Sequence, residues 1–236
     1  MARQKSSKSV AGGRFRTIRK WTIRLVLALV LLPPVLTVIY SVVPPVSTLM
    51  IGRYVQFLWV DRQWVPLEEI SPNLVRSVIA SEDSGFCDHD GVQWGALQKQ
   101  VEALSEGERP RGASTITMQT AKNLFLWGDR SYLRKGLELP LALMLDAILT
   151  KRRIMEIYLN IAQFGPDLFG AEAAAQHYFG RPAGSLTASQ AALLAATLPS
   201  PDTRDPANPD RYLRDRARTI EREARIAGAY IDCLYP

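Results

Sequence analysis

Cysteine is scarce in this sequence, with only two among 236 residues, Cys87 and Cys233. Two cysteines form at most one bridge, which excludes a disulfide-rich scaffold and leaves the redox compartment undecided. Internal repeats and low-complexity tracts are also absent from the sequence. The length predicts one globular domain plus a smaller segment, without room for a second large catalytic domain.

Acidic residues are absent from the first 24 positions, which hold eight lysines and arginines. The rest of the chain has 21 basic and 23 acidic residues, so the formal net charge of +6 arises in the N-terminal segment. Nucleic-acid binding needs a basic face on the folded domain. We therefore expect no nucleic-acid partner.

Charge of either sign is absent from residues 25–52, a run of 28 residues. A helix needs roughly 20 apolar residues to cross a bilayer, so we expect a transmembrane anchor at residues 22–44. The eight basic residues all lie on its N-terminal side. The positive-inside rule therefore predicts a cytoplasmic tail at residues 1–21 and a domain at residues 45–236 on the other side of the membrane.

Two alternatives exist for this apolar run. A cleaved signal peptide also has a basic segment before an apolar one, but no A-x-A site follows and the run exceeds a typical h-region. A buried core helix has no need of eight like charges beside it. Pro33 and Pro34 lie inside the run, where a transmembrane helix tolerates them as a kink.

The remaining chain follows a helical pattern almost throughout, which predicts a mainly α domain. Residues 45–70 are expected to form a linker with a short strand. Pro140 is expected to kink or divide the helical region at residues 131–160. Caps and apolar spacing predict further helices. These are residues 72–82 after Ser71, a helix capped by Asp90 with an apolar stripe of Trp94, Leu97, Val101 and Leu104, a helix capped by Ser114 that runs through Lys122, residues 171–179, residues 189–198 after Thr187, and residues 213–227.

The segment SEDSGFCDHDG at residues 81–91 places Glu82 and Asp83 where a helix runs into a glycine-containing turn. A carboxylate beside another carboxylate and under apolar cover has its pKa raised, which suits a general base or acid. A solvated acidic turn is the alternative. A metal site of Cys87, His89 and the aspartates is disfavoured, because these ligands lie too close in sequence to surround one ion.

The segment RGASTITMQTAKN at residues 111–123 presents hydroxyls and free backbone N–H groups at Ser114 and Thr115, an arrangement suited to anions. Basic residues follow at the end of this helix and beyond it, and such a cluster suits a phosphate or diphosphate. An ordinary capped helix with basic residues near its end is the alternative. The basic residues are Lys122, Arg130, Arg134 and Lys135.

Two more segments, RKGLE at residues 134–138 and KRRIMEIYLN at residues 151–160, place acids within apolar helices. Glu138 lies one turn from Lys135, so its two interpretations are a partly buried ion pair and a second catalytic carboxylate. Glu156 and Asn160 lie on one helical face, which indicates structural hydrogen bonds.

These segments, followed by LTASQAALLAATLP, have an order and spacing that strongly resembles the peptidoglycan glycosyltransferases of family 51, in particular the monofunctional biosynthetic type of Gram-negative bacteria. The resemblance covers about residues 53–200. It implies a lysozyme-like α-helical domain anchored in the inner membrane, with a periplasmic active site. A bifunctional penicillin-binding protein is excluded, because the sequence has no S-x-x-K and no K-T-G motif.

The resemblance implies that the chain polymerises glycan strands. Glu82 is expected to be the general base that deprotonates the N-acetylglucosamine 4-hydroxyl of lipid II, which attacks the growing strand with inversion and release of undecaprenyl diphosphate. Glu138 is expected to be the second catalytic carboxylate, which organises the basic cluster or the leaving-group side. The family pattern assigns the diphosphate to Lys122, Arg130, Arg134 and Lys135, and the cleft to Asp83, His89, Ser114, Thr115, Gln119 and Asn123.

The implied partners are lipid II, the nascent glycan chain and inner-membrane lipid, with divisome or elongation proteins as further candidates. No cofactor or metal is required by the resemblance, and the sequence does not indicate a divalent cation. Four residues depart from the family pattern, and the two that replace acids are not counted as catalytic. They are Met118 in place of a second glutamine, Asp146 and Gln190 in place of the usual acids, and Pro140 within its helix.

Two other functions share parts of this pattern. A lytic transglycosylase or muramidase of the same fold uses its glutamate as an acid on finished glycan. Such an enzyme has no diphosphate to stabilise, so the cations at residues 122–135 argue against it. An inactive membrane-anchored scaffold that recruits cell-wall proteins is the second alternative.

Overall fold

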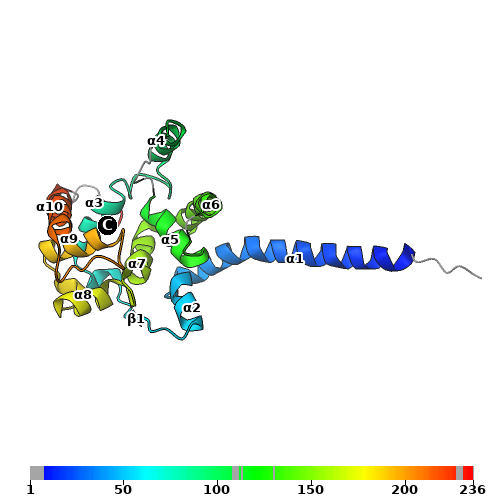
Figure 1. Cartoon of the computed structure of the whole chain (residues 1–236), viewed down its shortest axis with the longest axis horizontal. Coiled ribbons are helices and arrows are strands. Elements are labelled where there is room, and N and C mark those ends of the chain that lie inside the picture. Colours follow the sequence, from blue (N-terminus) through cyan, green and yellow to red (C-terminus); the bar gives the residue numbers. More distant parts are fainter. Residues whose placement is uncertain (1–7, 108–111, 113, 130, 227–230, 236) are drawn as a thin grey trace, which may run out of the picture.

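The computed structural model describes residues 8–107, 112, 114–129, 131–226 and 231–235 (Figure 1). Helices dominate it, so the prediction of a mainly α chain is confirmed. In chain order the elements are α1 (Lys8–Tyr40), α2 (Thr48–Val55), β1 (Asp61–Arg62), η1 (Leu67–Glu69), α3 (Pro72–Glu82), α4 (Trp94–Ser105), α5 (Ile116–Phe125), α6 (Tyr132–Ile148), α7 (Lys151–Ile161), β2 (Gln163–Gly165), β3 (Leu168–Phe169), α8 (Ala171–Phe179), η2 (Ala183–Ser185), α9 (Ala188–Thr197) and α10 (Arg211–Ile226).

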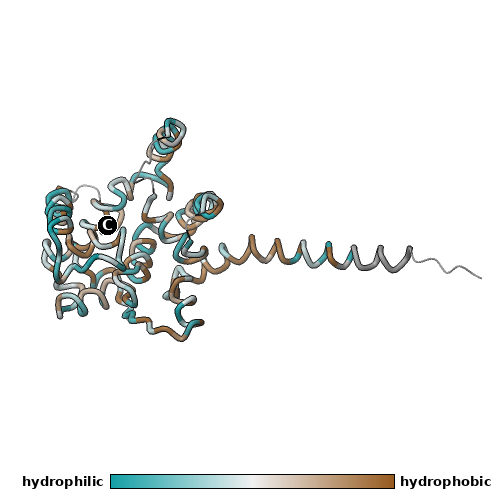
Figure 2. The backbone as a smooth tube through the Cα atoms, in the orientation of Figure 1, coloured by the Kyte–Doolittle hydropathy of each residue, from teal (hydrophilic) through white to brown (hydrophobic). Residues whose placement is uncertain are grey.

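The long helix α1 projects away from the other helices, and the stretch next to them is strongly apolar (Figure 2). Its segment Ile18–Tyr40 is long and apolar enough to cross a membrane, and only 6% of its most apolar part is buried. The alternative of a core helix is therefore wrong. An apolar helix that the described chain leaves bare suggests membrane anchoring, because water would not favour such exposure.

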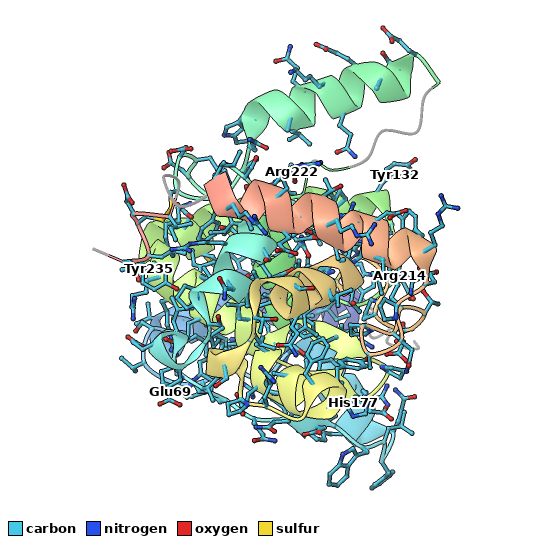
Figure 3. The ribbon with its side chains drawn as sticks, turned by 90° about the vertical axis from the view of Figure 1, so that its left-hand side faces the viewer. Glu69, Tyr132, His177, Arg214, Arg222 and Tyr235 are labelled. Atoms are coloured by element: carbon cyan, nitrogen blue, oxygen red, sulfur yellow. A yellow bond between two sulfur atoms is a disulfide. The ribbon has the colours of Figure 1, made fainter. Side chains whose placement is uncertain are left out.

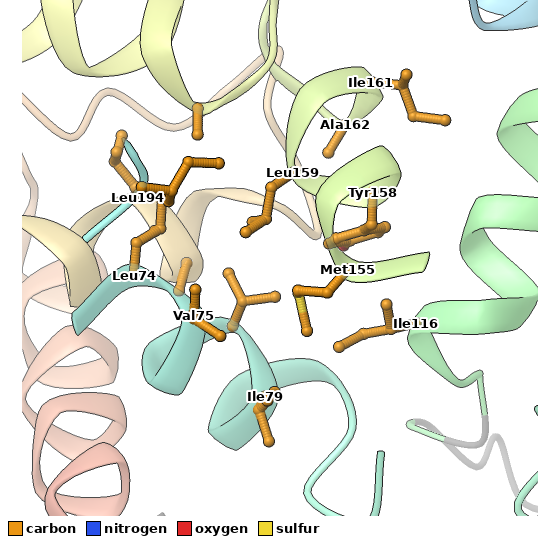
Figure 4. Close-up of a cluster of buried hydrophobic side chains, with 14 of the residues drawn as sticks. Leu74, Val75, Ile79, Ile116, Met155, Tyr158, Leu159, Ile161, Ala162 and Leu194 are labelled. Carbon is orange, nitrogen blue, oxygen red and sulfur yellow. The ribbon is translucent and has the colours of Figure 1, made fainter. Parts of the chain in front are cut away.

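Helix α7 lies in the middle of the hydrophobic core (Figure 4). Its side chains Met155 and Leu159 are fully buried, together with Leu74 of α3, Ile116 of α5 and Leu194 of α9. Burying each such side chain contributes about 1.5–3 kcal/mol. The core thus fixes α3 and α5 relative to one another, and these two helices carry Glu82, Gln119, Lys122 and Asn123.

Helix α10 covers α3 and α9 from outside. Leu213, Ala217 and Ile220 are buried on its inner face. Arg214 and Arg222 lie on its outer face (Figure 3). The predicted amphipathic helix with a charged outer face is confirmed, although its last predicted position, residue 227, lies outside the described residues.

The predicted starts of α3 and α9 are confirmed by their caps. The Ser71 side chain accepts a hydrogen bond from the N–H of Asn73. The Thr187 side chain accepts one from the N–H of Gln190, whose own side chain accepts from the N–H of Thr187. Each cap satisfies backbone donors that have no partner inside the helix.

The predicted division of the helical region at Pro140 is wrong, because α6 continues through this proline to Ile148. The break falls at Leu149 and Thr150, where the Thr150 side chain caps α7 by accepting from the N–H of Arg153. Threonine followed by a charged turn is a helix start signal. Here the Thr150 cap, and not Pro140, marks the boundary between two helices.

Residues 45–70 hold a helix, α2, that the sequence pattern did not predict. The predicted short strand is confirmed as β1, which pairs in parallel with β3, and β3 pairs antiparallel with β2. The linker after β1 is held by Asn160 of α7. Its side-chain amide accepts from the N–H of Val65 at 2.9 Å and donates to the Val65 carbonyl at 2.8 Å. The structural interpretation of Asn160 is therefore confirmed.

The helix α4 stands out from the helical body (Figures 1 and 3). It begins at Trp94 directly after Gln93, so the predicted cap by Asp90 is wrong. The side chains of Trp94 and Val101 are 57% and 59% exposed. The apolar spacing therefore predicted the helix, but of this stripe Trp94 and Val101 are exposed while Leu97 packs against the core.

Candidate active site

A cavity of about 540 Å³ opens between α5, α7 and the loop at residues 198–203. This volume is typical of a binding site for a small molecule or part of a larger one. Four of the residues singled out in the sequence line the cavity, namely Gln119, Lys122, Asn123 and Arg134. Three of them lie on α5, whose position against α7 is set by the core.

Glu82 is the last residue of α3 and is partly buried next to α5. Its Oε2 accepts a hydrogen bond from Nε2 of Gln119 at 2.8 Å, and its Oε1 accepts one from Oγ of Ser81 at 3.1 Å. Burial raises the pKa of Glu82, while these hydrogen bonds and the nearby charges of Arg216 and Lys122 oppose the rise. A carboxylate with a raised pKa and limited solvent access is suited to proton transfer.

Lys122 lines the cavity from α5. Burial lowers the pKa of Lys122, and the charges of Arg134 and Lys135 lower it further. Glu138 and Glu82 oppose this change, so Glu82 and Lys122 each influence the pKa of the other. Gln119, the hydrogen-bond partner of Glu82, lies one turn before Lys122 on α5, so the carboxylate and the ammonium group approach neighbouring turns of the same helix.

The side chain of Glu138 holds two of the predicted diphosphate ligands in place. It is almost completely buried and forms ion pairs with Arg134 and with Lys135, whose Nζ lies 2.9 Å from Glu138 Oε2. Arg134 also donates through Nε to the carbonyl of Asp129 at 2.7 Å. Lys135 donates to Oγ of Ser114 at 2.6 Å. These contacts link the first turns of α6 to Ser114, which directly precedes the cap of α5.

Seven other predicted site residues within the described chain do not line the cavity, namely Glu82, Asp83, His89, Ser114, Thr115, Lys135 and Glu138. The buried carboxylate of Asp83 contacts Nε2 of His89 at 2.9 and 3.1 Å and accepts from the N–H of Ile116 at 2.9 Å. Thr115 donates through Oγ1 to the carbonyl of Gly91 at 2.6 Å. These contacts tie the loop after Glu82 to the start of α5, so they fix where Glu82 meets Gln119.

The start of α5 differs by one residue from the prediction. Thr115 is the cap, and its side chain accepts from the N–H of Met118 at 3.0 Å. Ser114 precedes the helix and binds Lys135 instead. Adjacent serine and threonine are both good caps, so sequence alone does not choose between them.

The loop after Glu82 is also closed by a disulfide between Cys87 and Cys233, with Cα atoms 5.8 Å apart. The sequence left open whether the two cysteines pair, and the structure shows that they do. Cys87 carries no free thiolate, which removes a ligand from the alternative metal site. Next to it, Lys151 contacts the carbonyl of His89 and the carboxylate of Asp146.

The departures from the family pattern lie outside the cavity lining. Met118 is fully buried in the core. Asp146 forms an ion pair with Lys151, and Gln190 completes the cap of α9. The side chains of Asp146 and Gln190 therefore have structural partners in the described chain.

One predicted ligand and one residue that the sequence did not single out complete the site. Arg130 lies outside the described residues. Tyr158 of α7 lines the cavity, and its hydroxyl donates to Oε1 of Gln119 at 3.2 Å. Its spacing along the helix indicates a core residue, which is why the sequence did not single it out. A buried tyrosine hydroxyl usually needs a hydrogen-bond partner, and this need was the only signal of a further role.

Comparison of the sequence with known proteins identifies the family of the chain. The transglycosylase family model matches residues 50–225. A biosynthetic peptidoglycan transglycosylase of Agrobacterium fabrum is 53% identical over 222 residues, which cover 93% of this chain and 98% of that protein. Another from Brucella suis is 54% identical over 214 residues, 90% and 96% of the two chains. A third from Mesorhizobium japonicum is 54% identical over 225 residues, 93% and 95% of the two chains. The chain therefore belongs to the transglycosylase family.

Proposed function

We propose that this chain polymerises the glycan strands of peptidoglycan, with Glu82 as the general base and Lys122 as a ligand of the diphosphate. The chain is a glycosyltransferase enzyme of cell-wall synthesis, in line with the names of its relatives. One observation carries the assignment of roles. Glu82 accepts a hydrogen bond from Gln119, and Gln119 lines the cavity together with Lys122, one turn further along α5.

In the proposed step, the Glu82 carboxylate takes the proton from the 4-hydroxyl of the N-acetylglucosamine of lipid II. That oxygen attacks the anomeric carbon of the growing strand from the side opposite the diphosphate. The bond between this carbon and the diphosphate oxygen breaks, and undecaprenyl diphosphate leaves with the electron pair. The configuration inverts in a single displacement.

Negative charge accumulates on the leaving oxygens during this displacement, so fixed cations stabilise the transition state. Lys122 and Arg134 line the cavity, and Lys135 lies one residue further along α6. Arg130 is proposed as a further ligand from the family pattern. Glu138 acts through the cations that it pairs with, because its carboxylate is buried between Arg134 and Lys135.

We further propose that the chain is a single-pass protein of the inner membrane. Residues 1–21 then form the cytoplasmic tail, residues 22–44 the anchor and residues 45–236 the periplasmic domain. The eight basic residues before the apolar run support this orientation. Confining enzyme and lipid-linked substrate to one surface raises the effective concentration of the substrate.

The test is polymerisation of purified lipid II by the detergent-solubilised chain, with the products separated on a gel. Glu82→Gln should lower the rate by about 10²–10⁴-fold, the usual contribution of a general base. The matched control is Glu223→Gln on the exposed face of α10, which should polymerise at the normal rate. Normal activity of folded Glu82→Gln protein would refute the proposed base.

The same protein separates this function from its two rivals. Incubation with purified sacculi should release no soluble fragments, whereas a lytic enzyme would release them. An inactive scaffold would form no polymer from lipid II in any variant. Polymer from the wild-type chain and none from Glu82→Gln excludes both.

A further inference from the structure

A hydrogen-bond chain connects the core to the proposed base. Tyr158 of α7 donates its hydroxyl to Oε1 of Gln119, and Gln119 of α5 donates through Nε2 to Oε2 of Glu82. The three side chains come from three different helices, α7, α5 and α3. Tyr158 is only 1% exposed and packs among the apolar side chains of the core (Figure 4). Its ring therefore has a fixed position.

The direction of each bond follows from the chemistry of the groups. An ionised carboxylate only accepts hydrogen bonds, so the amide of Gln119 must present its NH₂ group to Glu82. Its carbonyl oxygen then faces Tyr158, and the hydroxyl must donate to it. Without that donor, the amide could rotate and bring its oxygen towards the carboxylate, where the two would repel.

We propose that Tyr158 is a positioning residue for catalysis, which acts through Gln119 by fixing the amide orientation that stabilises the ionised form of Glu82. The inference rests on the proposed role of Glu82 as base and adds a residue outside the charged cluster. It is distinct from substrate binding, because the hydroxyl is committed to Gln119.

The state of the phenol supports this role. Burial raises the pKa of Tyr158 well above its ordinary value, and the negative charges of Glu82 and Asp83 raise it further. The hydroxyl therefore keeps its proton at every pH at which the enzyme would work. It remains a donor while Glu82 titrates.

Several other groups act on Glu82, and any pH effect must be separated from theirs. Lys122 faces it from α5 and Arg216 from α10, and both favour the ionised form. Ser81 on the same helix donates to Oε1. Asp83, the next residue, is paired with His89. None of these groups contacts Tyr158 in a hydrogen bond or ion pair within the described residues, so a change at Tyr158 leaves their contacts intact.

The first experiment is Tyr158→Phe, which keeps the ring and removes the hydroxyl. The loss of one hydrogen bond in the chain should lower kcat for lipid II polymerisation about threefold to tenfold, with KM nearly unchanged. The acid limb of kcat/KM should move up by about 0.5–1 pH unit, because the ionised base loses support. Tyr178→Phe is the control. That hydroxyl donates to the Phe164 carbonyl at 3.1 Å, away from the site, and its loss should leave kcat and the pH limb unchanged.

The second experiment is a double-mutant cycle with Gln119→Leu, which distinguishes positioning from general destabilisation. If Tyr158 acts through Gln119, Tyr158→Phe should cause no further loss of kcat in the Gln119→Leu background. An equal loss in both backgrounds would overturn the inference, because the effect would then be independent of Gln119. A normal kcat and an unmoved acid limb in folded Tyr158→Phe protein would also overturn it.

Failure of the inference remains distinguishable from failure of the proposed function. Inactive Glu82→Gln protein beside fully active Tyr158→Phe protein refutes only the role of Tyr158. Active Glu82→Gln protein refutes the base itself and the inference with it.

Discussion

Arg153 on α7 donates its Nε–H to the carbonyl oxygen of Tyr40, the last residue of α1, at 2.8 Å. Its Nη2 donates to the Val43 carbonyl at 3.0 Å. The last carbonyls of a helix have no partner inside it, and here a guanidinium from the core supplies one. The same side chain pairs with Glu156, so the helix that suggests membrane anchoring is fixed directly to the central helix of the domain.

We expect Arg153→Met to destabilise the domain by about 1–3 kcal/mol, because Glu156 and the two carbonyls lose a largely buried donor. Thermal unfolding of the detergent-solubilised chain measures the effect. Arg218→Met is the control, since its pair with Asp215 is exposed on α10 and should contribute nothing measurable. Equal unfolding temperatures for both variants would contradict the proposed importance of the junction.

A plot of kcat/KM against pH should be bell-shaped. Its acid and alkaline limbs should lie closer together than the ordinary pKa values of glutamate and lysine would place them. As the proposed base, Glu82 has to be ionised, and its raised pKa should place the acid limb above the ordinary range of glutamate. As the proposed diphosphate ligand, Lys122 has to be protonated, and its lowered pKa should place the alkaline limb below the ordinary range of lysine.

Lys122→Arg identifies the alkaline limb, because a guanidinium keeps its proton throughout the accessible range. We expect this limb to move to higher pH or disappear while the acid limb stays near its place. Lys99→Arg on the exposed face of α4 serves as the matched control. An alkaline limb that is the same in Lys122→Arg and wild type would show that another group causes it.

Removing the charge of Glu138 should disturb the cations that it holds. Glu138→Gln leaves Arg134 and Lys135 without their partner, and we expect a loss of stability of up to about 3 kcal/mol. The pKa of Lys122 should fall further, because the Glu138 charge raises it. The alkaline limb of kcat/KM should therefore move to lower pH.

Thermal unfolding and the pH profile of Glu138→Gln measure these two effects. Glu102→Gln on the exposed part of α4 controls for the loss of one negative charge. An alkaline limb that moves to higher pH would mean that Glu138 does not support protonation of Lys122.

The disulfide should be a major source of stability for the loop after Glu82. It spans 146 residues, and bridges over long loops typically stabilise by about 2–5 kcal/mol. We expect the double variant Cys87→Ser, Cys233→Ser to unfold at a lower temperature. Wild-type protein in excess reductant should approach the same value, whereas reductant should leave the double variant unchanged. Indistinguishable unfolding of oxidised wild type and double variant would contradict this prediction.

Local signals in the sequence were sufficient for much of the fold. Ser71 and Thr187 predicted helix starts because a cap needs only neighbouring residues. The spacing of Leu213, Ala217 and Ile220 predicted the buried face of α10. The same kind of spacing failed for Trp94 and Val101, since periodicity gives a helical face and not its partner.

The site depended more on contacts between distant segments. Family motifs predicted roles for Glu82, Lys122 and Glu138, but local sequence could not show that Asp83 would cap the start of α5 from the other side of a loop. Tyr158 was missed for the same reason, because its partner Gln119 is 39 positions away. Pairing of Cys87 with Cys233 required the whole fold.

The bridge between Cys87 and Cys233 also sets an order of events during biogenesis. Cys233 leaves the ribosome 146 residues after Cys87, so the turn behind Glu82 stays unclamped until α9 and α10 have been made. A nascent chain therefore carries its proposed base without this covalent link while residues 88–232 are synthesised, so oxidation of the two cysteines is a maturation step for the loop after Glu82.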